Sequence, residues 1–157
     1  MLSLLLRNLF FTIVQPGVVA GLVPYLLLRY FGYEIVPTGL TTRHYIAATV
    51  FLVGFAIMTA CIFRFATEGR GTLSPLDPTK RLVINGLYRY TRNPMYVGVM
   101  TILGGEALFW WSIELAIYAV VIFGVFNAFI MLHEEPRLRR EFGPEFEDYT
   151  SRVGRWI

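Results

Sequence analysis

Charged residues are scarce in this sequence. Asp, Glu, Lys and Arg make up only 16% of its 157 residues, compared with about 25% in an ordinary soluble domain. Apolar residues account for 55%, above the roughly 45–50% of such domains, and an aromatic share of 16% excludes a disordered chain. We therefore expect a single membrane domain over residues 1–157, because a chain of this length leaves no room for a separate soluble catalytic module.

Residues that bind metals through sulfur or imidazole are also few. The single cysteine, Cys61, excludes an intramolecular disulfide bond and a thiolate-rich metal site. The two histidines, His44 and His133, are too few for a histidine-cluster metal centre. The net charge of +3 is small and requires no nucleic acid, because basic residues of membrane proteins gather in cytoplasmic loops. We expect neither a bound metal nor a nucleic-acid partner.

Long uncharged runs are the main positive signal. Asn8 to Leu28 contains 21 residues without a formal charge and Tyr45 to Phe63 contains 19, each close to the roughly 20 residues that a helix needs to cross a bilayer. A third run covers residues 93–113 and is interrupted only by Glu106, and an 18-residue fourth run covers Leu115 to Leu132. The sequence predicts an all-α membrane protein with about four transmembrane helices and short cytoplasmic C-terminal helices, in which the last two spans form an antiparallel hairpin.

Lys and Arg are distributed unevenly between the two sides of such a bundle. With four spans, the amino terminus, the connection of residues 64–92 and the tail after the fourth span lie on the same side. This side carries 12 of the 14 basic residues, and only Arg29 and Arg43 lie on the other. Since cytoplasmic loops hold the excess of Lys and Arg, both termini are expected in the cytoplasm. The polar segments 66–92 and 133–157 should then face each other at one boundary.

The end of the first polar segment predicts a helix terminus that attracts anions. Pro94 disfavours helical geometry at Asn93 and fits the first turn of the third span, with Asn93 as its N-cap. The positive end of that helix would attract a carboxylate or phosphate, and Arg89 and Arg92 would reinforce it. The same residues are also explained without a ligand, by helix capping and by arginines that reach the lipid headgroups.

The second polar segment begins with acidic residues. His133 follows the fourth span directly, and Glu134 and Glu135 are expected at the start of a helix, where carboxylates complement the dipole. Facing the arginines, these acids could hold a zwitterion, with its carboxylate near the arginines and its ammonium group near the glutamates. Later apolar residues recur at helical spacing and are expected to cover apolar surface. These residues are Phe146, Tyr149 and Val153. Trp156 suits an anchor at the membrane interface.

Two motifs lie in the last three-fifths of the chain, residues 64–157. The first comprises Arg70-Gly71-Thr72, Gly86-Leu87-Tyr88-Arg89-Tyr90, Arg92-Asn93-Pro94-Met95-Tyr96-Val97-Gly98 and Gly105-Glu106-Ala107. The second comprises Glu134-Glu135 and Phe142-Gly143. In order and spacing, these motifs resemble the isoprenylcysteine carboxyl methyltransferase and phospholipid methyltransferase superfamily of integral membrane enzymes. The eukaryotic isoprenylcysteine enzymes usually have His at the position of Asn93, whereas many bacterial relatives have Asn there, as this chain does. This departure concerns the acceptor more than the cofactor.

The resemblance implies S-adenosylmethionine as the methyl donor, bound at the cytoplasmic side, and a lipophilic acceptor that enters from the bilayer. By matching motif positions, the residues assigned to the cofactor are Tyr88, Arg92, Asn93, Tyr96, His133 and Glu134. An acceptor carboxylate needs no general base, and Arg64 is the catalytic candidate to orient it. Contact with lipid headgroups alone is the other interpretation of Arg64. For an amine acceptor, Glu135 is the nearest candidate to take up the proton.

Glu106 is a carboxyl group inside a span, which is energetically costly and therefore a functional candidate. It lies 12 residues beyond Pro94, about 18 Å along the helix, too deep to touch a methyl group held at the boundary. We expect it either to bind substrate along an acceptor tunnel, or to be protonated or hydrogen-bonded within the bundle. Small residues on the same span are expected to let helices approach closely. These are Gly98, Gly104 and Gly105.

Three classes of function remain open. A membrane methyltransferase is preferred, with either an isoprenylcysteine-like carboxylate or a phospholipid amine as acceptor. A nicotinamide-dependent membrane reductase is an alternative, because sterol reductases resemble this superfamily in their membrane-embedded half, although such a site should need more phosphate-binding arginines and a longer bundle. The third is a non-catalytic membrane scaffold. The sequence specifies neither the acceptor nor the oligomeric state.

Overall fold

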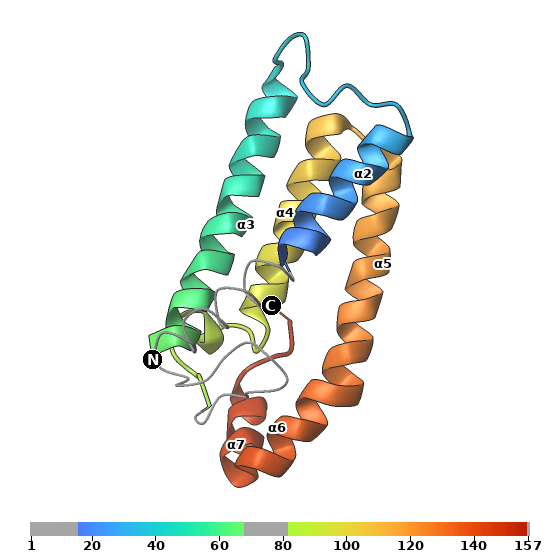
Figure 1. Ribbon diagram of the computed structural model, residues 1–157. Coiled ribbons are helices and arrows are strands. Elements are labelled where there is room, and N and C mark those ends of the chain that lie inside the picture. Colours follow the sequence, from blue (N-terminus) through green and yellow to red (C-terminus); the bar gives the residue numbers. More distant parts are fainter. Residues whose placement is uncertain (1–15, 68–81, 157) are drawn as a thin grey trace, which may run out of the picture.

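The computed structural model describes residues 16–67 and 82–156, and every regular element in these ranges is helical (Figure 1). The predicted all-α class is confirmed for this part of the chain. Residues 8–15 of the predicted first span and the Arg70-Gly71-Thr72 motif lie outside the described residues. In chain order the elements are η1 (Val18–Leu22), α2 (Val23–Tyr30), α3 (Thr42–Thr67), η2 (Gly86–Arg89), α4 (Pro94–Trp110), α5 (Ile113–Phe129), η3 (Ile130–Glu134), α6 (Glu135–Phe142) and α7 (Pro144–Arg152).

Two described helices are long and apolar enough to cross a membrane. The first is α3, over Thr42–Arg64, and the second is the continuous helix Ile113–Phe142, which comprises α5, η3 and α6. In the most apolar 18-residue stretch of each helix, only 17% is buried. This fits helices that face lipid better than core helices of a soluble protein. The helix Val18–Tyr30 is shorter, and α4 has 17 residues. Length and composition therefore identify two candidate spans, and the predicted number of four is not confirmed.

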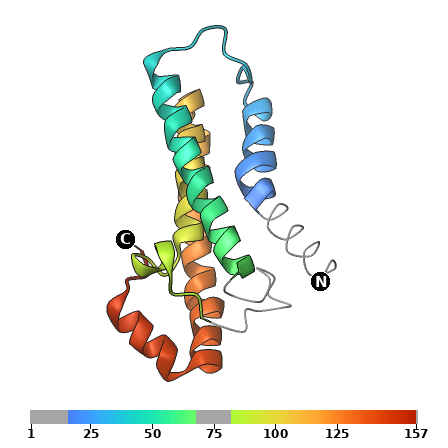
Figure 2. The same cartoon turned by 90° about the vertical axis from the view of Figure 1, so that its left-hand side faces the viewer.

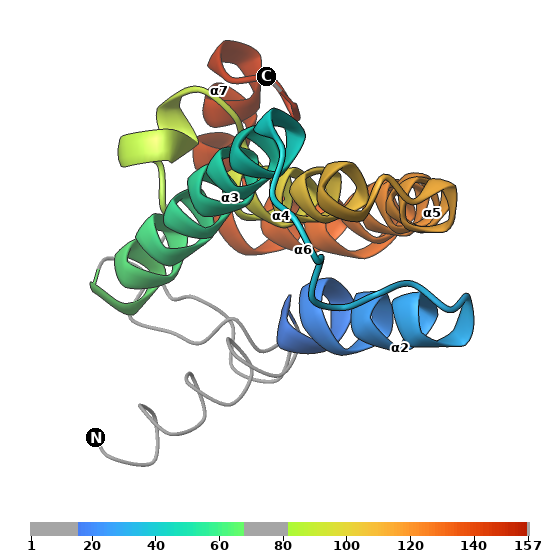
Figure 3. The same cartoon turned by 90° about the horizontal axis from the view of Figure 1, so that it is seen from above.

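The long helices lie side by side and alternate in direction. α3 runs from the connection of residues 31–41 toward η2, α4 returns, and α5 runs back from a tight turn (Figure 1 and Figure 2). Seen from above, α4 lies between α3 and α5, and α2 lies beside α5 (Figure 3). The turn uses a left-handed Trp111 (φ 51°), and the Ser112 side chain accepts a hydrogen bond from the Leu115 N–H at the start of α5. The predicted antiparallel hairpin is confirmed.

Glycines bring the backbones of α3 and α4 into contact. A Cβ atom on Gly54 would lie 2.7 Å from the Gly98 carbonyl oxygen, and one on Gly105 would lie 2.8 Å from the Phe51 nitrogen. Such small-residue interfaces are common between membrane helices, because they allow close van der Waals contact. The expected packing role therefore holds for Gly98 and Gly105. Gly104 faces open space, so the same expectation for it was wrong.

The first helix is distorted at Ala20, and Pro24 explains the distortion. A proline ring clashes with the carbonyl group four residues earlier, which here belongs to Ala20. Ala20 leaves helical geometry (φ −109°, ψ 18°), and Val18–Leu22 widens into a π-helix. In this register the Val19 carbonyl would need an N–H that Pro24 lacks. The Tyr118 hydroxyl of α5 donates to that carbonyl instead, at 2.8 Å, and ties the kinked helix to α5.

The fourth predicted span does not end at Leu132. α5 continues through η3 into α6, so that Glu134 and Glu135 lie inside a helix that runs from Ile113 to Phe142. Pro136 would clash with a regular helical turn before it. The π-helical turn relieves this clash, with the Glu135 N–H bonded to a carbonyl five residues back. The expectation that the two acids begin a separate helix with its own dipole was therefore wrong.

The C-terminal residues fold back against the bundle. Gly143 (φ 47°) breaks the helix and lets α7 reverse direction. Phe146 and Tyr149 of α7 are buried, with exposed fractions of 1% and 5%, as their spacing predicted. Trp156 was expected to anchor the chain at the membrane interface. This role stays a prediction. The indole N–H donates to Asn127 Oδ1 and the ring packs on α5, so Trp156 also attaches the C-terminal segment to the bundle.

Candidate functional site

Polar residues predicted from the sequence gather at one end of the bundle, where α4 begins (Figure 1). Asn93 immediately precedes α4, and Pro94 lies in its first turn, as predicted. The Asn93 side chain makes no capping hydrogen bond. Its Nδ2 donates to the Arg155 carbonyl oxygen at 3.0 Å, and Asn93 is only 6% exposed. Asn93 therefore connects the start of α4 to the C-terminal segment.

Tyr96 and Glu134 connect α4 to η3. The Tyr96 hydroxyl donates to Glu134 Oε2 at 2.9 Å, and the Tyr96 ring packs against Phe126 of α5. A hydroxyl donor orients a carboxylate, and the remaining lone pairs can accept further hydrogen bonds. Glu134 is therefore suited to hold an ammonium group or a hydroxyl.

Glu135 is held between two guanidinium groups. Arg155 engages both carboxylate oxygens, with Nε 2.8 Å from Oε1 and Nη2 2.9 Å from Oε2. Arg92 Nη1 lies 3.1 Å from the same Oε1. The hydrogen bonds to Glu135 hold the pKa of Arg155 above its ordinary value, and two neighbouring cations stabilise an ionised carboxylate. A carboxylate stabilised in this way takes up a proton less readily, which argues against Glu135 as the proton acceptor that the sequence suggested.

Two guanidinium nitrogens of this cluster, the Nε atoms of Arg92 and Arg137, are buried without a hydrogen-bond partner in the described part of the chain. A third such nitrogen, Arg43 Nε, lies at the start of α3, at the other end of the bundle. Arg137 follows Glu134 by three positions on the same helix, and its charge acts on both Glu134 and Tyr96. Its Nε lies 3.7 Å from Glu141 Oε1, an ion pair that is too long to be a hydrogen bond. A buried donor without an acceptor is costly, so both nitrogens are suited to an anionic ligand group.

Tyr88 is fixed on η2 by the C-terminal helix. The Tyr149 hydroxyl donates to the Tyr88 carbonyl oxygen at 2.7 Å. Burial raises the pKa of Tyr149 to about 12 and holds the pKa of Tyr88 well above its ordinary value. Both side chains are therefore neutral phenols near neutral pH, and Tyr88 can donate a hydrogen bond.

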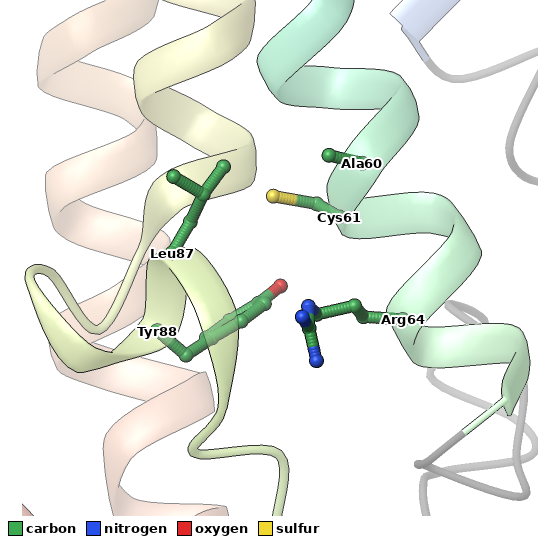
Figure 4. A pocket seen from close by; sticks show the side chains of 5 residues that line it. All are labelled: Ala60, Cys61, Arg64, Leu87 and Tyr88. Atoms are coloured by element: carbon green, nitrogen blue, oxygen red, sulfur yellow. The ribbon is translucent and has the colours of Figure 1, made fainter.

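Arg64 and Tyr88 share a small recess between α3 and η2. Figure 4 shows the Tyr88 ring pointing from η2 toward Cys61 and Arg64 on α3. The recess has a volume of about 10 Å³, close to the space that one water molecule needs. It is lined by Ala60, Cys61, Arg64, Leu87 and Tyr88. The Arg64 side chain crosses Gly86 so closely that a Cβ atom there would overlap it. This glycine therefore permits the position of Arg64.

Two residues expected in the site lie apart from these contacts. His133 is exposed, and its ring stacks on Phe129 of the same continuous helix. Glu106 is 8% exposed on α4, and its Oε2 has no hydrogen-bond partner among the described residues. Its charge acts on Tyr118 of α5, so Glu106 lies on the side of α4 that faces α5.

Sequence reasoning missed two arginines that the structure adds to the cluster. Arg137 could have been recognised from its spacing of three residues after Glu134, which places both side chains on one helix face. Arg155 left no such signal, because its partners Glu135 and Asn93 are 20 and 62 residues away along the chain.

The fold and the charged cluster define the class of the protein. Apolar helices meet half-buried arginines and glutamates at one end, which is typical of a membrane protein that handles a polar ligand at the boundary. Residues 42–145, about two thirds of the 157-residue chain, match the family of phospholipid methyltransferases. The chain belongs to this family of membrane methyltransferases, so the resemblance is confirmed. The match includes every predicted site residue and excludes Arg155. No curated protein and no solved structure matches the chain.

Proposed function

We propose that the protein transfers a methyl group from S-adenosylmethionine to a lipophilic acceptor, preferentially a carboxylate, at the cytoplasmic boundary of the membrane. The observation that carries the proposal is that Glu134, oriented by Tyr96, shares one end of the bundle with Arg92 and Arg137, whose Nε atoms have no hydrogen-bond partner among the described residues. An acid beside two bases complements a zwitterion. The diphosphate of a nicotinamide dinucleotide would favour cations and helix N-termini without a buried acid.

The residues present fit S-adenosylmethionine. Its carboxylate would be held by Arg92 and Arg137, whose Nε atoms lack acceptors among the described residues. Its ammonium group would be held by Glu134, whose carboxylate is oriented by the Tyr96 hydroxyl. Polar partners and a wall for the nucleoside would come from further residues of the same boundary. These are Tyr88, Asn93 and, at the exposed edge, His133. When bound, the donor supplies an electrophilic methyl group on a sulfonium cation.

The protein's own contribution to methyl transfer is alignment and exclusion of water. An in-line displacement needs the acceptor held along the axis of the breaking bond, and a closed site prevents hydrolysis. Arg64 is proposed to orient the acceptor carboxylate, since it lies at the cytoplasmic end of α3 beside Tyr88 (Figure 4). A carboxylate is already ionised at neutral pH, so no residue has to remove a proton from it.

The acceptor is proposed to enter from the bilayer. A lipid would lose about 0.8 kcal/mol for each methylene that it exposed to water, so lateral entry between helices is favoured over entry from the cytosol. Glu106 is proposed to lie along this path, because it is a buried carboxyl group on α4 whose Oε2 has no partner in the described part of the chain.

The proposed topology has four transmembrane spans, with both termini in the cytoplasm. It is supported by the uneven distribution of Lys and Arg along the sequence.

An amine of a phospholipid headgroup is the second candidate acceptor, favoured by the name of the matching family. An ammonium group must lose a proton before it attacks, and the site would have to supply an acceptor for that proton. Glu135 is the nearest acid of the motif, but its two guanidinium partners keep it ionised and occupied. The structure therefore supports a carboxylate better than an amine.

Binding titrations of the full chain in detergent test the donor assignment. S-adenosylmethionine should bind, NADPH should not, and Glu134→Gln should weaken donor binding by about tenfold or more, since a hydrogen bond to a charged group is worth about 1.5–3 kcal/mol. Glu147→Gln, an exposed site on α7, is the matched control and should bind normally. Binding of NADPH alone would support a reductase, and binding of neither would support a scaffold.

A further inference from the structure

The last described residues form a strap across the start of α4 that bonds both to residues 91–93 and to α5. We define the strap as Gly154, Arg155 and Trp156. The Gly154 carbonyl accepts from the Arg92 N–H at 2.9 Å. The Arg155 carbonyl accepts from Thr91 Oγ1 and from Asn93 Nδ2, both at 3.0 Å. Trp156 donates to α5. The strap therefore satisfies the polar groups of residues 91–93 that the helix itself leaves unpaired.

The Arg155 side chain adds a second connection, to Glu135. Its guanidinium forms two parallel hydrogen bonds with the carboxylate, which is the strongest geometry available to an Arg–carboxylate pair. Arg92 Nη1 lies 3.1 Å from Oε1 of the same carboxylate, and Arg92 Nε makes no hydrogen bond to it. Because Arg155 occupies both oxygens, Arg92 cannot form the same two-point contact with Glu135, and its Nε remains without an acceptor among the described residues.

We propose that Arg155 is a positioning residue for the methyl donor: by occupying Glu135 it keeps the Arg92 guanidinium available for the donor carboxylate. The proposal rests on the function proposed above. Without Arg155, Glu135 would capture Arg92 in a two-point ion pair, and the donor would have to break that pair to bind. Arg155 thus acts through Glu135 and Arg92 and touches no reacting atom.

The test compares Arg155→Gln, Glu135→Gln and the double variant in donor titrations and in methyl-transfer kinetics. Arg155→Gln should raise the dissociation constant for S-adenosylmethionine by about tenfold or more, the effect of a lost charged hydrogen bond, while kcat at saturating donor stays near that of the unsubstituted protein. The double variant should bind the donor more tightly than Arg155→Gln alone, because Glu135 can no longer capture Arg92. A merely structural role would instead make the double variant the weaker of the two.

The neighbouring Arg152→Gln is the matched control, since Arg152 is exposed and pairs only with Asp148 in the described part of the chain. It should leave donor affinity unchanged. If Arg155→Gln does not fold, Arg155→Lys keeps the charge but loses the two-point geometry and should show a smaller loss of affinity. Normal affinity in Arg155→Gln, or no recovery in the double variant, would overturn the inference alone. Absence of donor binding by the unsubstituted protein would overturn the proposed function and the inference with it.

Discussion

Replacement of Gly54 by alanine should force α3 and α4 apart. The new Cβ atom would lie 2.7 Å from the Gly98 carbonyl oxygen and from the Ile102 nitrogen, whereas ordinary contacts begin at 3.4 Å. The opposing atoms belong to backbone, so the helices must separate by about 0.7 Å at this point. Overpacking of this kind typically costs about 1–3 kcal/mol. Gly104→Ala is the matched control, because its Cβ atom would meet nothing within 4 Å.

The comparison of the two variants isolates the clash from the general effect of replacing a helical glycine. Alanine improves helix propensity by about 1 kcal/mol at either site, so Gly104→Ala should be neutral or stabilising. Thermal unfolding in detergent should place the midpoint of Gly54→Ala several degrees below that of Gly104→Ala, since about 1 kcal/mol corresponds to about 2–4 °C for a domain of this size. Equal midpoints would refute the close approach of the two helices.

Three further predictions concern residues at other depths of the bundle. Glu106→Gln should leave S-adenosylmethionine binding unchanged but slow turnover of a long-chain acceptor more than of a short one, and equal losses in binding and turnover would place Glu106 in the donor site. Tyr118→Phe leaves the Val19 carbonyl without its donor and should lower the free energy of unfolding by about 1–3 kcal/mol, whereas the exposed Tyr45→Phe should not. For Tyr149, whose pKa is raised to about 12, the unfolded phenol ionises first as pH rises above about 10. Stability should therefore fall between about pH 10 and pH 12, and less steeply in Tyr149→Phe.

The helices were predictable where the bilayer dictates them. A backbone in hydrocarbon must satisfy its own hydrogen bonds, so a long uncharged run has to be helical. This rule correctly predicted α3 and the hairpin of α4 and α5, and Pro94 marked the start of α4. It fails after Leu132, where it predicts that the helix ends at the first charged residues. The helix continues for ten further residues, to Phe142, since the π-helical turn accommodates Pro136.

The site was predictable only in part, because its decisive contacts join residues far apart in the chain. The motif spacing put Tyr96 and Glu134 at one boundary, and they form a hydrogen bond across 38 residues. Nothing in a local pattern reveals that Asn93 bonds to the Arg155 carbonyl rather than capping α4. The role of Glu135 changes for the same reason, since its two arginine partners come from different segments.

The central claim, methyl transfer from S-adenosylmethionine to a lipid carboxylate, is tested most directly by following a labelled methyl group. The purified protein in lipid vesicles is supplied with methyl-labelled S-adenosylmethionine and either a prenylated cysteine with a free carboxylate or an amino-headgroup phospholipid. We expect label in the prenylated cysteine, which mild base releases as methanol because the product is an ester, and loss of this label in Glu134→Gln. Label in the phospholipid that resists base would establish an amine acceptor. Donor binding without label in either lipid would contradict the account.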